Sequence, residues 1–165
     1  MDYTDITFIL EKGKYDTLLL DRDGVINEYR PNDYVKRWEE FIFIPEFLEA
    51  IPQWSKWVKR IVIITNQRGI SKGLYTEEDL REIHAKMIES IEKAGGRIDK
   101  IYHCAAMDKK DPNRKPQPGM FHQMLKDFPD TNPDKCLMVG DMMTDMEFAN
   151  NCGIAGILIN EKPAI

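Results

Sequence analysis

The chain has 165 residues and a formal net charge of −5, with 42% hydrophobic and 31% charged residues. That length and composition predict one compact domain spanning residues 1–165 and exclude a fibrous or intrinsically disordered chain. No apolar run approaches the roughly 18 residues of a membrane span, and the negative charge argues against nucleic acid or an anionic membrane as a partner, so we expect neither.

The first eleven residues carry acids at Asp2 and Asp5 and lack a basic stretch followed by an apolar one. They do not resemble a signal peptide, so we expect a cytoplasmic protein. The cysteines are odd in number, widely spaced and set in apolar stretches: Cys104, Cys136 and Cys152. We expect all of them to be reduced and buried.

Five short apolar runs alternate with helix-like stretches along the chain, which predicts parallel strands joined by crossover helices. The runs are residues 17–20, 61–64, 98–105, 136–139 and 154–159. Their continuous Val, Ile and Leu content indicates strands that are covered on both faces. The predicted fold is a doubly wound, Rossmann-like α/β sandwich: a mainly parallel five-stranded sheet, helices on both faces and no large cap domain.

The first two predicted helices flank the second strand. Residues 45–58 have apolar side chains at helical spacing, but Pro52 would remove an internal hydrogen bond, so a kinked or split helix is expected. The other helix begins at Thr76, an N-cap followed by three acids, and stops at Gly95. Its predicted buried stripe is Leu80, Ile83, Met87, Ile91 and Ala94.

The last two predicted helices follow the third and fourth strands. One starts with Pro118 in its first turn and runs to Phe128, since proline is tolerated at the start of a helix. The other is expected to be capped by Thr144 and to end before Gly153.

An acid pair follows the first strand directly, at the edge where open α/β sheets bind their ligands. Asp21 and Asp23 can both reach one site if the strand ends between them, and Gly24 lets the chain turn away. Phosphoryl transfer to a carboxylate needs a nucleophile and a group that protonates the leaving oxygen. Asp21 suits the first role and Asp23 the second, although the pair alone is equally consistent with a turn.

Two later segments would meet the acid pair at the same edge. Thr65 and Asn66 follow the second strand and offer neutral donors suited to phosphoryl oxygens. Arg114 and Lys115 precede a helix N-terminus, where a lysine can neutralise the nucleophile and the transferring phosphoryl group together. Each segment alone is more often a strand end or a solvated surface feature.

The fourth strand ends in Gly140-Asp141, and Asp145 follows four residues later. Mg²⁺ prefers oxygen ligands, and Asp21, Asp141 and the backbone carbonyl of Asp23 would supply them. Asp145 is expected to orient Lys115 rather than to bind metal. The joint occurrence of acid pair, threonine, lysine and Gly-Asp in this order is the signal, because each part alone is weak.

In these motifs the chain resembles the haloacid dehalogenase superfamily, over about residues 16–160. It is most similar to the small, capless branch that contains heptose bisphosphate and histidinol-phosphate phosphatases. The matching segments are residues 21–27, 65–70, 73–76 and 114–120. The resemblance implies a Mg²⁺-dependent phosphatase that forms an aspartyl-phosphate on Asp21. It also implies substrate contacts by Asn66, Gln67, Arg68 and Arg114.

The chain departs from that branch in one loop. The branch commonly holds a structural zinc through cysteine and histidine ligands, but here residues 111–113 read Asp-Pro-Asn where two cysteines would stand. Cys104 and its neighbour His103 cannot complete a four-ligand zinc site, so no structural zinc is expected. The loop at residues 107–113 must then be held by turn residues.

The expected partner is a small phosphorylated metabolite such as a heptose bisphosphate, and the expected state is a monomer or weak dimer. Three alternatives remain at this stage: a histidinol-phosphate phosphatase, a polynucleotide 3′-phosphatase and a non-catalytic phosphate-binding protein. The acidic charge counts against the second, because single-stranded nucleic acid is bound in basic, aromatic grooves.

Overall fold

The computed structural model describes residues 1–162 of the chain. At its centre lies a five-stranded sheet with the spatial order β3-β2-β1-β4-β5, and all neighbouring strands are parallel. The strands are β1 (Thr17–Leu20), β2 (Arg60–Asn66), β3 (Lys100–Cys104), β4 (Cys136–Gly140) and β5 (Ala155–Leu158). The predicted doubly wound fold is confirmed, with a third strand shorter than expected.

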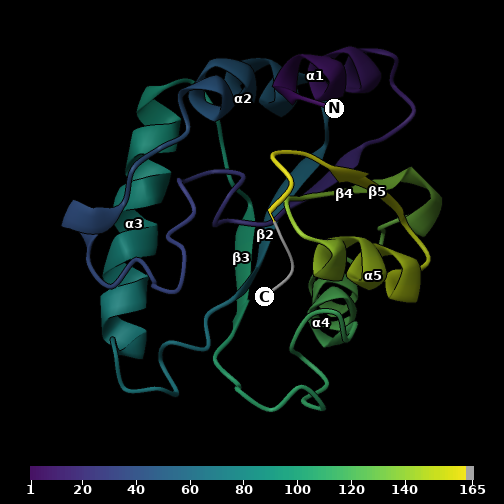
Figure 1. Ribbon diagram of the computed structural model, residues 1–165. Helices are drawn as coiled ribbons and strands as arrows, with labels where there is room; N and C mark the ends of the chain where they lie inside the picture. The colour runs from purple at the N-terminus through teal and green to yellow at the C-terminus, as the bar shows by residue number, and fades with distance from the viewer. Residues whose placement is uncertain (163–165) are drawn as a thin grey trace.

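Helices cover both faces of this sheet (Figure 1). They are α1 (Tyr3–Glu11), α2 (Pro45–Trp57), α3 (Glu77–Lys93), α4 (Gly119–Asp127) and α5 (Met143–Cys152). The first three share one hydrophobic core with the sheet, while α4 and α5 share the other. Short 3-10 turns lie at Trp38–Glu40 and Pro133–Lys135.

Alternate residues of each central strand serve the two cores. Leu18 and Leu20 belong to the cluster under α1–α3, whereas Leu19 between them belongs to the cluster under α4 and α5. All three are fully buried, and burial of such a side chain contributes roughly 1.5–3 kcal/mol. The sheet is thus fixed from both sides, which holds the strand ends in place.

One helix was not anticipated. The acids Asp2 and Asp5, taken above only as evidence against a signal peptide, form a capping box: each carboxylate accepts a hydrogen bond from the other residue's backbone amide. The resulting α1 buries Tyr3, Ile6 and Leu10. An acidic residue at N-cap and another three positions later was the available signal.

Several helix details differ from expectation. Pro52 lies inside an uninterrupted α2, so the predicted split is wrong; burial of Phe47, Ile51 and Trp54 outweighs one lost backbone hydrogen bond. In α3 the Thr76 cap is confirmed, but Ala94 is the exposed C-cap residue rather than part of the buried stripe.

The last two helices begin differently from the prediction. Pro118 is the N-cap of α4 rather than a first-turn residue. Thr144 lies inside the first turn of α5, whose N-cap is Met142, because the nearby Asp145 carboxylate takes the free backbone amides. The predicted stop is confirmed, since Gly153 adopts a left-handed φ of 69°.

Between β1 and α2 the chain forms a long connection, residues 21–44, in place of a cap domain. It contains isolated bridges from Asn27 to Asp23 and to Phe43. All the cysteines are free, and Cys152 is only partly buried, contrary to expectation. Within residues 1–162, no helix combines the length and apolarity that crossing a membrane requires.

Candidate active site

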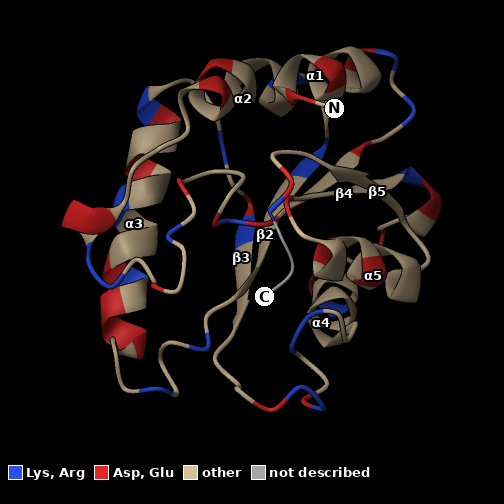
Figure 2. Ribbon diagram, in the orientation of Figure 1, with Lys and Arg blue, Asp and Glu red and all other residues tan. Residues whose placement is uncertain are grey.

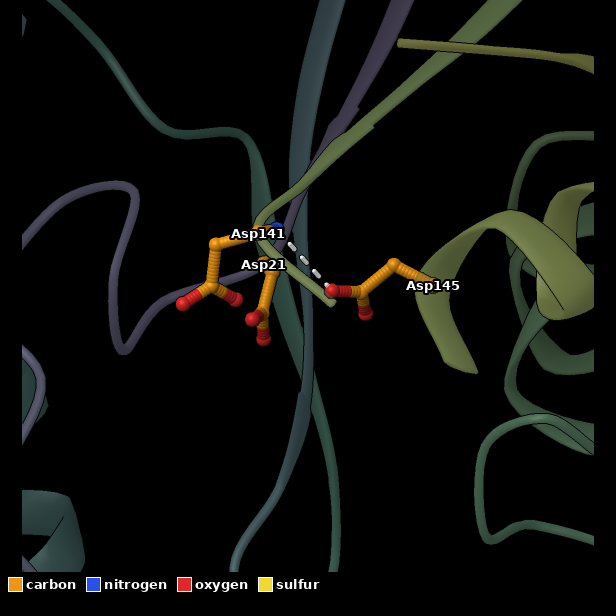
Figure 3. Close-up of side chains that lie close together, drawn as sticks. All are labelled: Asp21, Asp141 and Asp145. Carbon is orange, nitrogen blue, oxygen red and sulfur yellow. Dashed lines mark hydrogen bonds between the residues drawn. The ribbon is translucent and has the colours of Figure 1, made fainter. Parts of the chain in front are cut away.

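The site lies where the strand order reverses. β1 and β4 are neighbours at the centre of the sheet, and a crevice outside their carboxyl ends is the usual ligand position in such folds. Asp21 follows β1 and Asp141 follows β4, and Figure 3 shows their carboxylates side by side. Asp145 reaches toward them from α5. The sequence-predicted acids therefore meet, as expected.

Lys115 is the cation of this cluster. Its Nζ donates hydrogen bonds to Asp21 Oδ1 at 2.9 Å and to Asp145 Oδ1 at 2.7 Å, and the residue is only 5% exposed. Burial would lower the pKa of Lys115, but the charges of Asp145 and Asp21 outweigh it and raise the pKa above its usual value. These charges favour the ammonium form of Lys115, which is held against the proposed nucleophile.

The side chain of Asn66 fixes the segment that carries Lys115. Its Nδ2 donates to the carbonyl of Lys115 at 3.1 Å, and the Lys115 amide donates to Asn66 Oδ1 at 3.0 Å. This paired contact joins the end of β2 to the loop before α4. Sequence reasoning predicted Asn66 beside the substrate but not this second role.

The acids outnumber the cation. Asp21, Asp141 and Asp145 each offer an oxygen, and these oxygens lie within 4.8 Å of one another. Burial, with the charge of Asp145, raises the pKa of Asp21; burial, with the charge of Asp21, raises that of Asp141. One lysine cannot neutralise all three carboxylates, so the cluster lacks positive charge.

Within residues 1–162, Asp141 is the carboxylate of this cluster that has no hydrogen-bond partner. The residue is fully buried, and neither of its carboxylate oxygens has a hydrogen-bond partner among residues 1–162. An uncompensated buried carboxylate is costly, so this pair of oxygens beside Asp21 fits a divalent cation. By contrast, both oxygens of Asp145 are engaged, one by Lys115 and the other by the amides of Asp141 and Met142.

Gly24 makes room for Asp141. Its φ is 90°, and a Cβ atom placed on it would lie 1.8 Å from Asp141 Oδ2. Any side chain there would push the carboxylate out of position. The glycine that sequence reasoning assigned to a turn therefore also sets the position of a predicted metal ligand.

Asp23 is held by three donors. Arg22 Nη2 and Asn27 Nδ2 donate to Oδ1 at 2.8 and 2.9 Å, and Gln67 Nε2 donates to Oδ2 at 3.0 Å. Burial would raise the pKa of Asp23, but the Arg22 charge and these hydrogen bonds lower it below its usual value. Asp23 is thus an oriented carboxylate beside the cluster.

Other residues around Asp23 were not predicted. Arg22 is fully buried, lies 5.7 Å from the Phe41 ring and contacts His84 Nε2 at 3.1 Å. Tyr75 donates to the side chain of Gln67. Arg22 and Tyr75 lie inside the matched sequence segments, but nothing in those segments indicates which side chains meet.

The predicted substrate-binding arginines make hydrogen bonds to groups outside the carboxylate cluster. Arg68 donates to the Tyr34 hydroxyl at 2.9 Å, and Arg114 donates to the Met107 carbonyl. Thr65 and Gln67, predicted at the end of β2, are each 1% exposed and lie beside Asp23. An open cavity of about 580 Å³ borders the site, lined by Gly24, Glu28, Tyr29, Ile44, Asn160, Glu161 and Lys162.

The loop at residues 107–113 is held by hydrogen bonds. Asp111 Oδ1 accepts the Asn113 amide at 2.8 Å, and Cys104 Sγ lies 3.8 Å from the same oxygen. His103 Nε2 contacts Glu77 at 2.7 Å instead of turning toward Cys104. The structure thus shows the turn that sequence reasoning required, while the absence of zinc stays a prediction.

Comparison with known proteins assigns the chain to a class. The HAD-hydrolase-like family model matches residues 112–161, which include Lys115, Asp141 and Asp145. A crystal structure of D,D-heptose 1,7-bisphosphate phosphatase from B. bronchiseptica, complexed with magnesium and phosphate, superposes with a TM-score of 0.80. It has 33% identity and covers 87% of this chain and 79% of that one. The class is the haloacid dehalogenase-like hydrolases.

Curated relatives narrow the class. The D-glycero-alpha-D-manno-heptose-1,7-bisphosphate 7-phosphatase of Mycobacterium bovis is 35% identical over 139 residues, 84% of this chain and 73% of the relative. The corresponding beta-anomer phosphatase of Neisseria meningitidis is 34% identical over 137 residues, 82% of this chain and 72% of the relative. The chain therefore belongs to the haloacid dehalogenase-like phosphatases, in the branch that contains the heptose bisphosphate phosphatases.

Proposed function

We propose that the protein is a Mg²⁺-dependent phosphatase that hydrolyses a small sugar phosphate through an aspartyl-phosphate on Asp21. The contact of Lys115 Nζ with Asp21 Oδ1, beside the unpartnered Asp141 carboxylate, is the observation that supports this best. It combines a carboxylate held for attack with a deficit of positive charge that a divalent metal ion would fill.

The proposed metal ligands are Asp21, Asp141 and the backbone carbonyl of Asp23. Bound Mg²⁺ would neutralise negative charge on the acids and on the incoming phosphate, as such ions do in phosphoryl transfer. Asp145 is proposed to support the site from outside this ligand set, because its oxygens already accept from Lys115 and two backbone amides.

The reaction then has two steps. Asp23 is a carboxylate before substrate binds and takes up a proton together with the substrate's phosphate. An oxygen of Asp21 then bonds to phosphorus while the bond to the sugar oxygen breaks, and Asp23 gives that oxygen this proton. Water next attacks the aspartyl-phosphate, Asp23 takes a proton from it, and phosphate leaves with the Asp21 carboxylate restored. Thr65, the Asn66 amide and Lys115 stabilise the phosphoryl oxygens, which is electrostatic preorganisation.

The proposed substrate is D-glycero-D-manno-heptose 1,7-bisphosphate, on the strength of the relatives named above. Arg68 and Arg114 are proposed to contact its sugar hydroxyls or its second phosphate. Gln67 was expected to share that role, but it is buried and contacts Asp23 and Thr65 instead. The anomer stays open, since the relatives are named for both.

Asp21→Asn tests the nucleophile. Removing the attacking oxygen's charge should lower kcat on p-nitrophenyl phosphate with Mg²⁺ by more than about 10³-fold, while circular dichroism shows an unchanged fold. Asp134→Asn is the matched control, because this exposed acid lies before the start of β4, at the opposite end from the site. A near-normal rate for Asp21→Asn would refute the assignment.

A substrate screen tests the proposed substrate and the alternative functions. We expect the highest kcat/KM on one anomer of the heptose bisphosphate, above that on histidinol phosphate and on a 3′-phosphorylated oligonucleotide. Preference for the oligonucleotide, with loss of activity as salt rises, would indicate a nucleic-acid enzyme instead. Binding of inorganic phosphate without turnover of any substrate would indicate a phosphate-binding protein.

A further inference from the structure

Gln67 is buried between two proposed catalytic groups. Its Nε2 donates to Asp23 Oδ2 at 3.0 Å and to Thr65 Oγ1 at 2.9 Å, and its Oε1 accepts from the Tyr75 hydroxyl. The residue is 1% exposed, and its backbone amide donates to the Cys104 carbonyl at 2.7 Å. All the polar atoms of this side chain are therefore engaged within the protein.

The chemistry of the partners fixes which way the amide faces. Asp23 is paired with Arg22 at 2.8 Å and is a carboxylate, and a carboxylate only accepts hydrogen bonds. The NH₂ group of Gln67 must therefore face Asp23, which leaves its oxygen for Tyr75. Tyr75 is 4% exposed and acts as the donor that holds the amide in this orientation.

That orientation determines where the Thr65 proton can point. Because Thr65 Oγ1 already accepts from Gln67, its own hydrogen must be donated elsewhere. The acceptor it has in the structure is the Asn66 carbonyl at 3.4 Å, which is long for a hydroxyl donor. The hydroxyl hydrogen is thus weakly held and free to turn toward a phosphoryl oxygen.

We infer that Gln67 is a positioning residue that aims two groups at once, the Thr65 hydroxyl hydrogen toward the phosphoryl group and the Asp23 carboxylate toward the leaving oxygen. Tyr75 fixes Gln67 in this role. The inference rests on the proposed function, since it assigns Gln67 a part in phosphoryl transfer. It replaces the expectation of a direct substrate contact.

Gln67→Met is the decisive variant, because methionine keeps the length and volume of the side chain but cannot donate. We expect kcat/KM on an alkyl phosphate, the heptose bisphosphate or the best alkyl substrate found, to fall by about 10²-fold. The loss of kcat/KM on p-nitrophenyl phosphate should be clearly smaller, because p-nitrophenolate leaves without a proton. We compare kcat/KM because it reports the step that forms the aspartyl-phosphate, whereas kcat also includes its hydrolysis, in which Asp23 serves both substrates alike. Gln53→Met, at an exposed position of α2, is the matched control.

Tyr75→Phe tests the same arrangement if Gln67→Met does not fold. It removes one hydrogen bond to Gln67 and should lower kcat/KM by about 3–10-fold on the alkyl phosphate. A folded Gln67→Met, or failing that Tyr75→Phe, with wild-type kcat/KM on both substrates would overturn the inference. Equal losses on both substrates would overturn its Asp23 half, since a general loss of active protein has that effect. Failure of the proposed function would instead be seen as an inactive wild-type protein.

Discussion

Asp141 shows how a single residue position is set by its neighbours rather than by its own segment. Its carboxylate is fully buried against Gly24, Asp21 and the start of α5, and within the described residues 1–162 its oxygens lack hydrogen-bond donors. The acidity of the residue made it a candidate ligand from sequence. The absence of competing donors, which makes it a good ligand, depends on the packing around it.

Gly24→Ala should weaken Mg²⁺ binding by about 10–100-fold, the usual cost of disturbing the residues that orient a ligand. The added Cβ would meet Asp141 Oδ2 at 1.8 Å, so the carboxylate has to move away. Thermal-shift titration with Mg²⁺ would measure the change in affinity.

Gly13→Ala is the matched control for that experiment. Gly13 also has a positive φ, 76°, but no atom of the described part of the chain lies within 4 Å of an added Cβ. This variant should lose about 1–2 kcal/mol of stability from backbone strain and keep its Mg²⁺ affinity. If both variants bind Mg²⁺ equally well, Asp141 does not depend on the space at Gly24.

The main site residues were predictable because their segments directly follow buried strands. Asp21 and Asp141 each follow one, Thr65 lies near the end of β2, and parallel strands bring such positions to one edge. The hydrogen-bond partners were not predictable in the same way. Gln67 was assigned to the substrate from the family resemblance, yet its partner Tyr75 lies eight residues away across a loop.

Among the helices, α1 is part of the hydrophobic core and also contacts the loop that follows Asp21. Trp54 Nε1 of α2 donates to Thr7 Oγ1 at 2.8 Å, and the Tyr3 hydroxyl donates to the Val25 carbonyl. Val25 lies four residues after Asp21. The N-terminal helix therefore connects the packing of α2 to the loop that follows the proposed nucleophile.

Leu10→Ala should cost about 2–5 kcal/mol of unfolding free energy, the usual range for a fully buried leucine. Leu10 is 0% exposed, whereas Phe8 on the same helix is 58% exposed. Phe8→Ala is therefore the control and should change stability by less than about 0.5 kcal/mol. Urea unfolding of both variants measures this; equal stability of Leu10→Ala and the parent would show that α1 packs only loosely.

Element boundaries were harder to predict than element identity. The strands and four helices follow from periodicity, since apolar spacing is a strong local signal. The course of α2 through Pro52 does not, because burial of Trp54 against Tyr3 and Phe47 decides it. The start of α5 likewise depends on Asp145, whose carboxylate is fixed by Lys115 from a distant segment.

Over the whole molecule, residues of both charge signs alternate on the surface, and buried charged residues gather mainly in one region. Figure 2 shows acidic and basic residues interspersed over the helices and loops. Ion pairs between such exposed residues each contribute little to the stability of the fold. Buried ionisable groups cluster around the site instead, with Arg22, Lys115, Asp21, Asp141 and Asp145 all below 9% exposure. The pH dependence of stability should therefore come mainly from this region.

His84 makes one contribution to the pH dependence of stability that can be tested. It is 8% exposed and faces Arg22, with Asp23 and His103 nearby. Burial, then the positive charge of Arg22, lowers its pKa to about 3 from an ordinary value of 6.5. The unfolded chain thus binds a proton more readily than the folded one between these values. Stability from this group is complete above pH 6.5 and is lost as pH falls toward 3.

His84→Gln should remove this contribution to the pH dependence of stability, because glutamine can accept a hydrogen bond from Arg22 but cannot be protonated there. Between pH 7 and pH 4.5 the parent should lose about 2–3 kcal/mol more unfolding free energy than the variant. Urea unfolding of both proteins at the two pH values, without added metal, isolates the difference because the carboxylates titrate in each. Parallel losses in parent and variant would mean that His84 is protonated in the folded protein, and the Arg22 contact would then have to be water-mediated or absent.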